Sequence, residues 1–274
     1  MEESRIKYLE AVASEIRKDI VKMVGVARSG PLDLPLALSD LLVYLYWEEL
    51  VVLPAHSSRE DRDRLLVGVE DAAPAVYAVL AARGFFDREE LWHYRRLGAM
   101  LQSTPDYKRT PGIDAPCLNS GEIAIASSLA QAVRKIDSKP RVFCLALLSE
   151  CSENNFIDEV KRSASQNLSN LYLLLLCDAR AEDFSETIVK RSNELKAEGW
   201  NVFTADGKDF VSMENVFASA EQNSKRPVAV FTLLYTVKGF SFIDAVQSKN
   251  PGSMSMGDMD QALEELEGNI NDQQ

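Results

Sequence analysis

Hydrophobic residues follow helical spacing in the first hundred positions of the chain. Apolar side chains recur every three or four residues from Ile6 to Val26, and the segment from Leu36 to Val51 is strongly apolar. This spacing places the apolar side chains on one side of a helix. A third helix is expected over Ala73 to Arg83. The segment from Leu101 to Pro116 carries three prolines and a glycine, which predicts a loop.

The pattern changes in the second half, where short apolar runs alternate with helical segments. The expected strands are Val142–Leu148, Leu171–Cys177, Asn201–Ala205 and Val228–Tyr235. The expected helices are Gly121–Lys135, a helix containing Phe156, Val160 and Ala164, Glu186–Ala197 and Phe210–Gln222. Strands that alternate with helices in this way are typical of βαβ units. The sequence therefore predicts an α/β protein in which a parallel sheet has helices on both faces.

Length and composition predict one large domain. The chain has 274 residues, of which 46% are hydrophobic, enough to bury a full core. We assign residues 1–250 to this domain. Residues 251–274 are polar and acidic, and we expect them to form a tail with a short helix at Met259–Leu266.

Charge and cysteine usage restrict the partners and the compartment. The formal net charge is −12, which disfavours binding to nucleic acid or to an anionic membrane surface. The apolar run Leu171–Cys177 is too short to span a bilayer. The four cysteines form no CxxC pair, and the N-terminus lacks the layout of a signal peptide. These features predict a protein of the cytoplasm.

The stretch from Leu145 to Asn155 joins an expected strand to an expected helix. Ligands of α/β sheets bind at such carboxyl ends of strands. The turn reads Leu147-Leu148-Ser149-Glu150, without glycine. Its chemistry decides which ligand this edge could hold.

Seven groups of residues resemble the N-terminal half of transketolase, in the same order and at nearly the same spacing. They are Ser29-Gly30 with Leu36 and Asp40-Leu41-Leu42; Asp63-Arg64; Ala72 to Ala78; Arg83-Gly84-Phe85-Phe86; Thr110-Pro111-Gly112; Asn170-Leu171; and Thr236-Val237-Lys238-Gly239. The chain looks like the separate N-terminal subunit that some organisms use. The resemblance implies a thiamine diphosphate-binding fold, a divalent metal, several catalytic histidines and a large interface with a C-terminal half.

The histidines of this family are replaced in the present chain. The family's Gly-His-Pro-Gly-Gly corresponds to Gly30-Pro31-Leu32-Asp33-Leu34, so Pro31 replaces a histidine. Its Ser-Lys-Gly-His corresponds to Gly68-Val69-Glu70-Asp71, its Gly-His-Pro-Asp to Ser103-Thr104-Pro105-Asp106, and its Trp-His-Gly to Ser253-Met254-Ser255. The chain has two histidines, His56 and His93, and neither falls at a family site position. Both are expected to be surface or packing residues.

The metal-binding positions of the family are replaced as well. Its Gly-Asp-Gly-Glu turn corresponds to Leu147-Leu148-Ser149-Glu150, and Leu148 offers no oxygen to magnesium. Asp178 is then the only ligand-type residue left at a family metal position. The family's second glycine-rich loop survives only as Cys117 to Ile123. We therefore assign no catalytic, cofactor-binding or metal-binding residue, and expect neither thiamine diphosphate nor magnesium to bind.

Other features have a structural interpretation beside the functional one. Asp33, Glu70, Asp71 and Asp178 are expected to cluster around the cavity and to repel a diphosphate. Asp71 together with Glu70 could act as a general base in catalysis, but a solvated pair of charged side chains is favoured. Cys117, Cys151 and Cys177 could form a metal or redox site, but small core residues are favoured. Leu42, Tyr46 and Trp47 could face a partner subunit or pack in the core.

Three hypotheses about function follow. The first is a transketolase-like pseudoenzyme, a non-catalytic subunit that acts through a homodimer or a C-terminal-half transketolase-type subunit. The second is an active thiamine diphosphate-dependent ketol transferase subunit with an atypical site completed by its partner. The third is a pocket repurposed for another small molecule, cationic or neutral. Fold alone does not decide among them.

Overall fold

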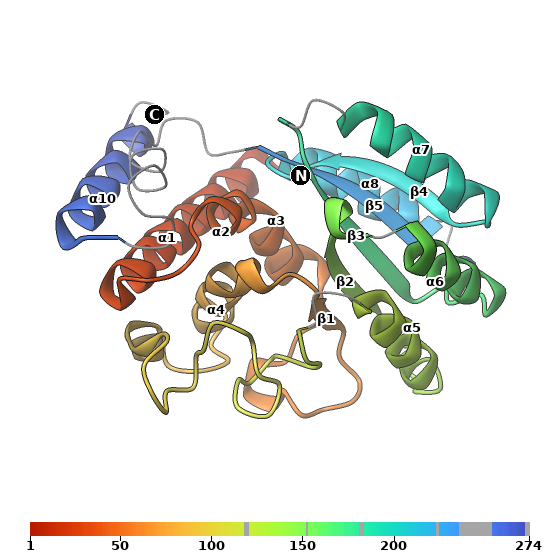
Figure 1. Cartoon of the computed structure of the whole chain (residues 1–274), viewed down its shortest axis with the longest axis horizontal. Helices are drawn as coiled ribbons and strands as arrows, with labels where there is room; N and C mark the ends of the chain where they lie inside the picture. Colours follow the sequence, from red (N-terminus) through yellow and green to blue (C-terminus); the bar gives the residue numbers. More distant parts are fainter. Residues whose placement is uncertain (118–120, 152, 181–183, 223–224, 236–253, 272–274) are drawn as a thin grey trace.

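The protein folds into an α/β structure in the computed structural model, which describes residues 1–117, 121–151, 153–180, 184–222, 225–235 and 254–271 (Figure 1). The helices of the first part are α1 (Glu3–Ala27), α2 (Asp33–Ala37), α3 (Ser39–Tyr44) and α4 (Ala73–Ala82). A π-helical turn, Leu45–Glu49, continues α3. The later helices are α5 (Glu122–Val133), α6 (Glu153–Ser165), α7 (Phe184–Ala197), α8 (Phe210–Gln222) and α10 (Met256–Asn271).

A parallel sheet forms the centre of the molecule. Its strands are β1 (Arg64–Val67), β2 (Val142–Leu147), β3 (Leu171–Asp178), β4 (Asn201–Asp206) and β5 (Val228–Leu234). Within the described residues the sheet has five strands in the order β1-β2-β3-β5-β4. Every pair is parallel, for example Leu145 beside Leu174. All four expected strands are confirmed, with ends that differ by one residue at most.

Helices cover both faces of the sheet, as the alternation of strands and helices predicts. Side chains that alternate along β2 point to opposite faces. Phe143 and Leu145 pack in one core cluster with residues of α1, α3, α4 and α8. Cys144 and Ala146 pack in the other with residues of α5, α6 and α7. Both faces of the central strands are therefore buried, which explains their continuous apolar sequences.

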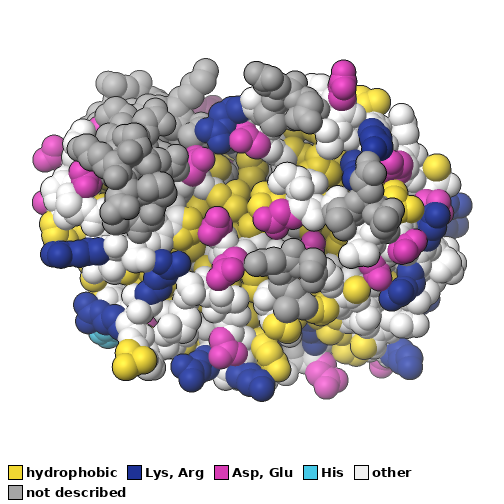
Figure 2. All heavy atoms as spheres, in the orientation of Figure 1, with side chains coloured by type: hydrophobic (Ala, Val, Ile, Leu, Met, Phe, Trp, Pro, Cys, Tyr) yellow, Lys and Arg dark blue, Asp and Glu magenta, His cyan; other side chains and the backbone are white. Residues whose placement is uncertain are grey.

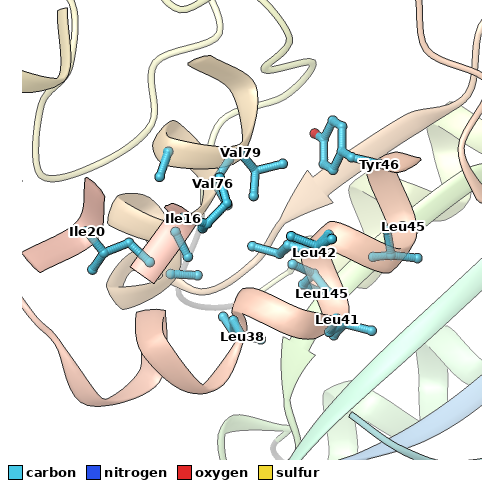
Figure 3. Packing of buried hydrophobic residues seen from close by; sticks show 14 of the residues in the cluster. Ile16, Ile20, Leu38, Leu41, Leu42, Leu45, Tyr46, Val76, Val79 and Leu145 are labelled. Atoms are coloured by element: carbon cyan, nitrogen blue, oxygen red, sulfur yellow. The ribbon is translucent and has the colours of Figure 1, made fainter. Parts of the chain in front are cut away.

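The N-terminal helices meet the sheet in a dense apolar core (Figure 3). Ile16 and Ile20 come from α1, Leu42 from α3, Val76 from α4 and Leu145 from β2, and all are buried in one cluster. Leu42 and Tyr46 are 0% and 3% exposed, so they are core residues. Trp47 is partly exposed, and its indole N–H donates to the Tyr8 hydroxyl at 3.2 Å. Of the three residues considered for a partner surface, Trp47 is therefore the one with an exposed part.

Strand β1 was not predicted from the sequence. It is four residues long and follows the charged run Asp61-Arg62-Asp63. Arg64 is nevertheless buried within it, because its guanidinium donates to the backbone carbonyls of Glu60 and Arg62 at distances between 2.9 and 3.2 Å. A charged residue satisfied in this way gives no apolar signal in the sequence.

The C-terminal helix is longer than the expected Met259–Leu266. Helix α10 packs on α1, and Met259, Ala262 and Leu266 are buried in the same cluster as the N-terminal helices. A Cβ atom at Gly25 of α1 would lie 2.6 Å from the Met259 sulfur, so this close approach requires glycine. The division of the chain at residue 250 stays a prediction.

Candidate functional site

The turn after β2 lies at the carboxyl edge of the sheet. Figure 2 shows a hollow in the middle of the displayed face of the molecule, where apolar side chains are exposed and acidic side chains lie along the border. Leu148–Glu150 form a single 3₁₀ turn between β2 and α6. Leu148 is 7% exposed and packs in the cluster under α5, α6 and α7. Its side chain therefore belongs to the core at the position where the resemblance implies a metal-binding carboxylate.

Asp178 ends strand β3 and is held by an arginine. The Nε and Nη2 atoms of Arg180 each lie 2.9 Å from one carboxylate oxygen of Asp178. The Arg180 backbone N–H also donates to Asp178 at 3.0 Å. The hydrogen bond from the Arg180 side chain lowers the pKa of Asp178. The ligand-type residue that the sequence singled out is thus paired with a cation of the protein itself.

Asp33 joins this pair from a distant part of the chain. It begins α2, and its carboxylate lies 3.3 Å from Nη2 of Arg180. One guanidinium group therefore bridges two of the four acidic residues expected at the cavity. Sequence reasoning missed Arg180. Its position two residues after Asp178 was the available signal, because a guanidinium there can reach back to the carboxylate.

The other two acidic residues expected at the cavity are Glu70 and Asp71, and the charge of Asp71 reaches a further acidic residue, Glu150. The Thr104 hydroxyl donates to Glu70 at 2.5 Å, while Asp71 is exposed. The charge of Asp71 acts on Glu150, and burial followed by this charge raises the pKa of Glu150. The solvent exposure of Asp71 favours the interpretation of a solvated charge pair over a general base.

Glu122 is an acidic residue that sequence reasoning did not assign to the site. It begins α5, and its Cγ atom would lie 2.5 Å from a Cβ atom at Gly68. The glycine therefore makes room for this side chain. Its Oε2 atom is buried and accepts no hydrogen bond within the described residues. Burial, and to a lesser degree Glu150, raise the pKa of Glu122.

Three of the four thiols are buried core side chains. Cys144, Cys151 and Cys177 are at most 8% exposed and belong to one apolar cluster, whereas Cys117 is half-buried. Burial raises the pKa of Cys117 to about 11 and that of Cys151 and Cys177 to about 12. The described residues contain no group of three or more His, Cys, Asp or Glu that could hold a metal. Protonated, buried thiols favour the packing interpretation.

Both histidines lie on the surface, as expected. His56 is exposed, and half of the His93 side chain is accessible beside Glu90. Neither lies in the groups around Asp178 or Glu122 described above. Three expected features fall outside the described residues: Thr236 to Gly239, Ser253, and the segment 118–120 of the second family loop. In the part of the chain that the structure describes, no helix is long and apolar enough to cross a membrane.

We expect Glu122→Gln to stabilise the protein at neutral pH, because burial disfavours the charged carboxylate of Glu122. The gain should be at most about 1 kcal/mol, since the side chain keeps partial solvent access. A raised pKa means that the folded state binds a proton more readily than the unfolded state, so stability falls as pH rises above the ordinary value of 4.5 through the raised value. The advantage of Glu122→Gln should therefore grow over this window. Urea unfolding between pH 4.5 and pH 8 measures it.

The control for this prediction is Glu10→Gln on the exposed side of α1. It should track the unmodified protein at every pH. A stability difference between Glu122→Gln and the unmodified protein that does not change with pH would contradict the prediction.

Comparisons with known proteins identify relatives of the chain. Residues 9–140 match the family described as transketolase, thiamine diphosphate binding domain. A 6-deoxy-6-sulfo-D-fructose transketolase subunit of Clostridium sp. is 26% identical over 84% of this chain and 85% of its own length. An apulose-4-phosphate transketolase subunit of Phocaeicola vulgatus is 22% identical over 97% of this chain and 96% of its own length.

Solved structures show the same fold. Transketolase from Campylobacter jejuni superimposes with a TM-score of 0.82 at 20% identity, over 97% of this chain and 43% of that one. Transketolase from Leishmania mexicana gives a TM-score of 0.74 at 16% identity, over 96% of this chain and 45% of that one. The chain therefore spans less than half the length of these solved transketolases.

Proposed function

Because residues 9–140 match the family described as transketolase, thiamine diphosphate binding domain, we propose that the chain is a non-catalytic subunit of this family, without thiamine diphosphate or magnesium. On this proposal the fold is kept for assembly with another chain. The carboxyl edge of the sheet has lost the groups that ketol transfer requires.

The state of the two family metal positions carries the proposal. Magnesium requires oxygen ligands in nearly octahedral geometry at about 2.0–2.1 Å. Leu148 offers none and is packed in the core, and both carboxylate oxygens of Asp178 already accept hydrogen bonds from Arg180. The residues present therefore do not fit a magnesium-bound diphosphate. The Oε2 atom of Glu122 is buried and accepts no hydrogen bond within the described residues, and in its charged form this carboxylate at the same edge opposes a polyanion.

The relatives support a role within an assembly. Both curated relatives described above are named as subunits, and each aligns with most of the present chain. We therefore propose a homodimer, or a complex with a C-terminal-half transketolase-type subunit, as the working form. The buried, protonated thiols are compatible with a reducing cytoplasm.

A second candidate function is an active ketol transferase subunit whose site is completed by its partner. The names of the two relatives favour it, because both are described as transketolase subunits. Glu150 also keeps the carboxylate at the last position of the family's Gly-Asp-Gly-Glu turn. This function requires metal ligands from outside the described residues.

Calorimetric titration with thiamine diphosphate and magnesium tests the proposal, with the protein alone and together with any co-purifying chain. We expect no heat of binding in either condition at millimolar ligand. Saturable binding would overturn the proposal and support the second candidate.

A further inference from the structure

Arg180 connects two acidic residues that are distant in the sequence. Asp178 ends β3, Arg180 follows it within two residues, and Asp33 begins α2. The contact from Arg180 to Asp33 spans 147 positions of the sequence. It is therefore formed only when α2 packs beside the carboxyl end of the sheet.

The contacts of Arg180 are those of a bound cation. Two nitrogens hold Asp178 in a forked arrangement, both at 2.9 Å, and the second of them also reaches Asp33 at 3.3 Å. A forked pair of this kind fixes geometry as well as charge. The two carboxylates thus face each other across a single guanidinium nitrogen.

Two carboxylates that share one centre are ligands suited to a hard divalent cation. A guanidinium group stays charged at every accessible pH and presents its donors in a rigid fork. Its positive charge between the carboxylates opposes a second cation at the same place. The arginine is part of the chain, so metal ions in solution compete with a group that is always present.

We infer that Arg180 is a built-in counter-cation that prevents Asp178 and Asp33 from binding a divalent metal. This inference rests on the proposed function, and it names the residue that would maintain the metal-free state. Loss of the ligand at Leu148 removes one oxygen donor. Arg180 pairs with the carboxylate of Asp178, the oxygen donor that remains.

The test measures binding of Mn²⁺ by the loss of its free paramagnetic resonance signal. The variants are Arg180→Met, which removes the charge, Arg180→Lys, which keeps it, and Arg180→Met combined with Asp178→Asn. Arg180 is 54% exposed, so Arg180→Met is expected to fold, and thermal unfolding of each variant verifies this.

We expect Arg180→Met to bind Mn²⁺ about tenfold more tightly, or more, than the unmodified protein. Arg180→Lys should behave as the unmodified protein, and the double variant should lose the gain. Equal Mn²⁺ affinity in Arg180→Met and the unmodified protein would overturn the inference, as would a gain that survives Asp178→Asn.

The inference and the proposed function fail in different ways. Saturable binding of thiamine diphosphate with magnesium by the unmodified protein overturns the proposed function. If that titration shows no heat and Arg180→Met gains no Mn²⁺ affinity, only the inference is overturned.

Discussion

Arg141→Met is expected to lower the free energy of unfolding by about 3 kcal/mol, because it leaves buried carboxylates without their cation. The Arg141 guanidinium lies 2.8 Å from Asp63, pairs with Glu49 and is within 3.4 Å of Glu221. Asp63 is 5% exposed. Although burial of Arg141 favours its neutral form, Asp63 and Glu49 together raise the pKa of the guanidinium.

Arg141 directly precedes β2, and its guanidinium also contacts two aromatic rings. Its guanidinium lies 5.1 Å from the ring of Phe143 and 5.8 Å from that of Tyr172. Arg141→Met keeps most of the apolar stem, so the expected loss comes mainly from the unpaired charges. Asp63 keeps two backbone N–H donors, from Val51 and Arg141, which limits the loss.

Urea unfolding at pH 7 measures this effect, with Arg59→Met as the matched control. Arg59 forms a comparable pair with Asp61, but the two side chains are 56% and 37% exposed. Exposed pairs contribute little, so the control should unfold like the unmodified protein. A loss below about 1 kcal/mol for Arg141→Met would contradict the expectation.

Leu148→Asp is expected to lower the free energy of unfolding by about 3 kcal/mol without restoring magnesium binding. The substitution removes an apolar side chain from the cluster under α5, α6 and α7 and places a carboxylate in its position. Glu122 and Glu150 already raise the pKa of Cys151 by their charge, after the larger effect of burial. A further negative charge here would be repelled by these two carboxylates, and the nearby Arg191 is already paired with Glu194.

Urea unfolding with and without added magnesium tests this expectation. Leu148→Met is the matched control, since it conserves volume and should cost less than about 1.5 kcal/mol. If Leu148→Asp were as stable as the control, or if magnesium stabilised it, the result would contradict our proposal that the residues at this edge do not fit magnesium.

The sequence predicted the fold because strand and helix patterns are local. Continuous apolar runs such as Leu171–Cys177 are typical of strands buried on both faces, and the structure has β3 there. Spaced motifs from Ser29 to Asn170 indicated the family over most of the chain. The prediction that Leu148 stands at the position of a family aspartate also came from the sequence, because it concerns residue type, and it stays a prediction.

Other features depend on residues that are distant in the sequence. Strand β1 gives no apolar pattern at its first residue, because that residue is Arg64. Its guanidinium donates hydrogen bonds to backbone carbonyls, which allows a charged residue to be buried there. The packing of α10 on α1 at Gly25 is likewise a contact between segments that are distant in the sequence. Both are tertiary effects that override local patterns.

The sequence by itself determined the α/β class and the resemblance to transketolase, because both depend on residue type and spacing. Our proposal that the family's histidines and metal-binding turn are replaced comes from the same residues. Only the tertiary structure decided which side chains meet at the carboxyl edge of the sheet. Arg180 between Asp178 and Asp33, and Glu122 against Gly68, are contacts between separate elements. Their energies depend on distance and burial, which a one-dimensional pattern does not contain.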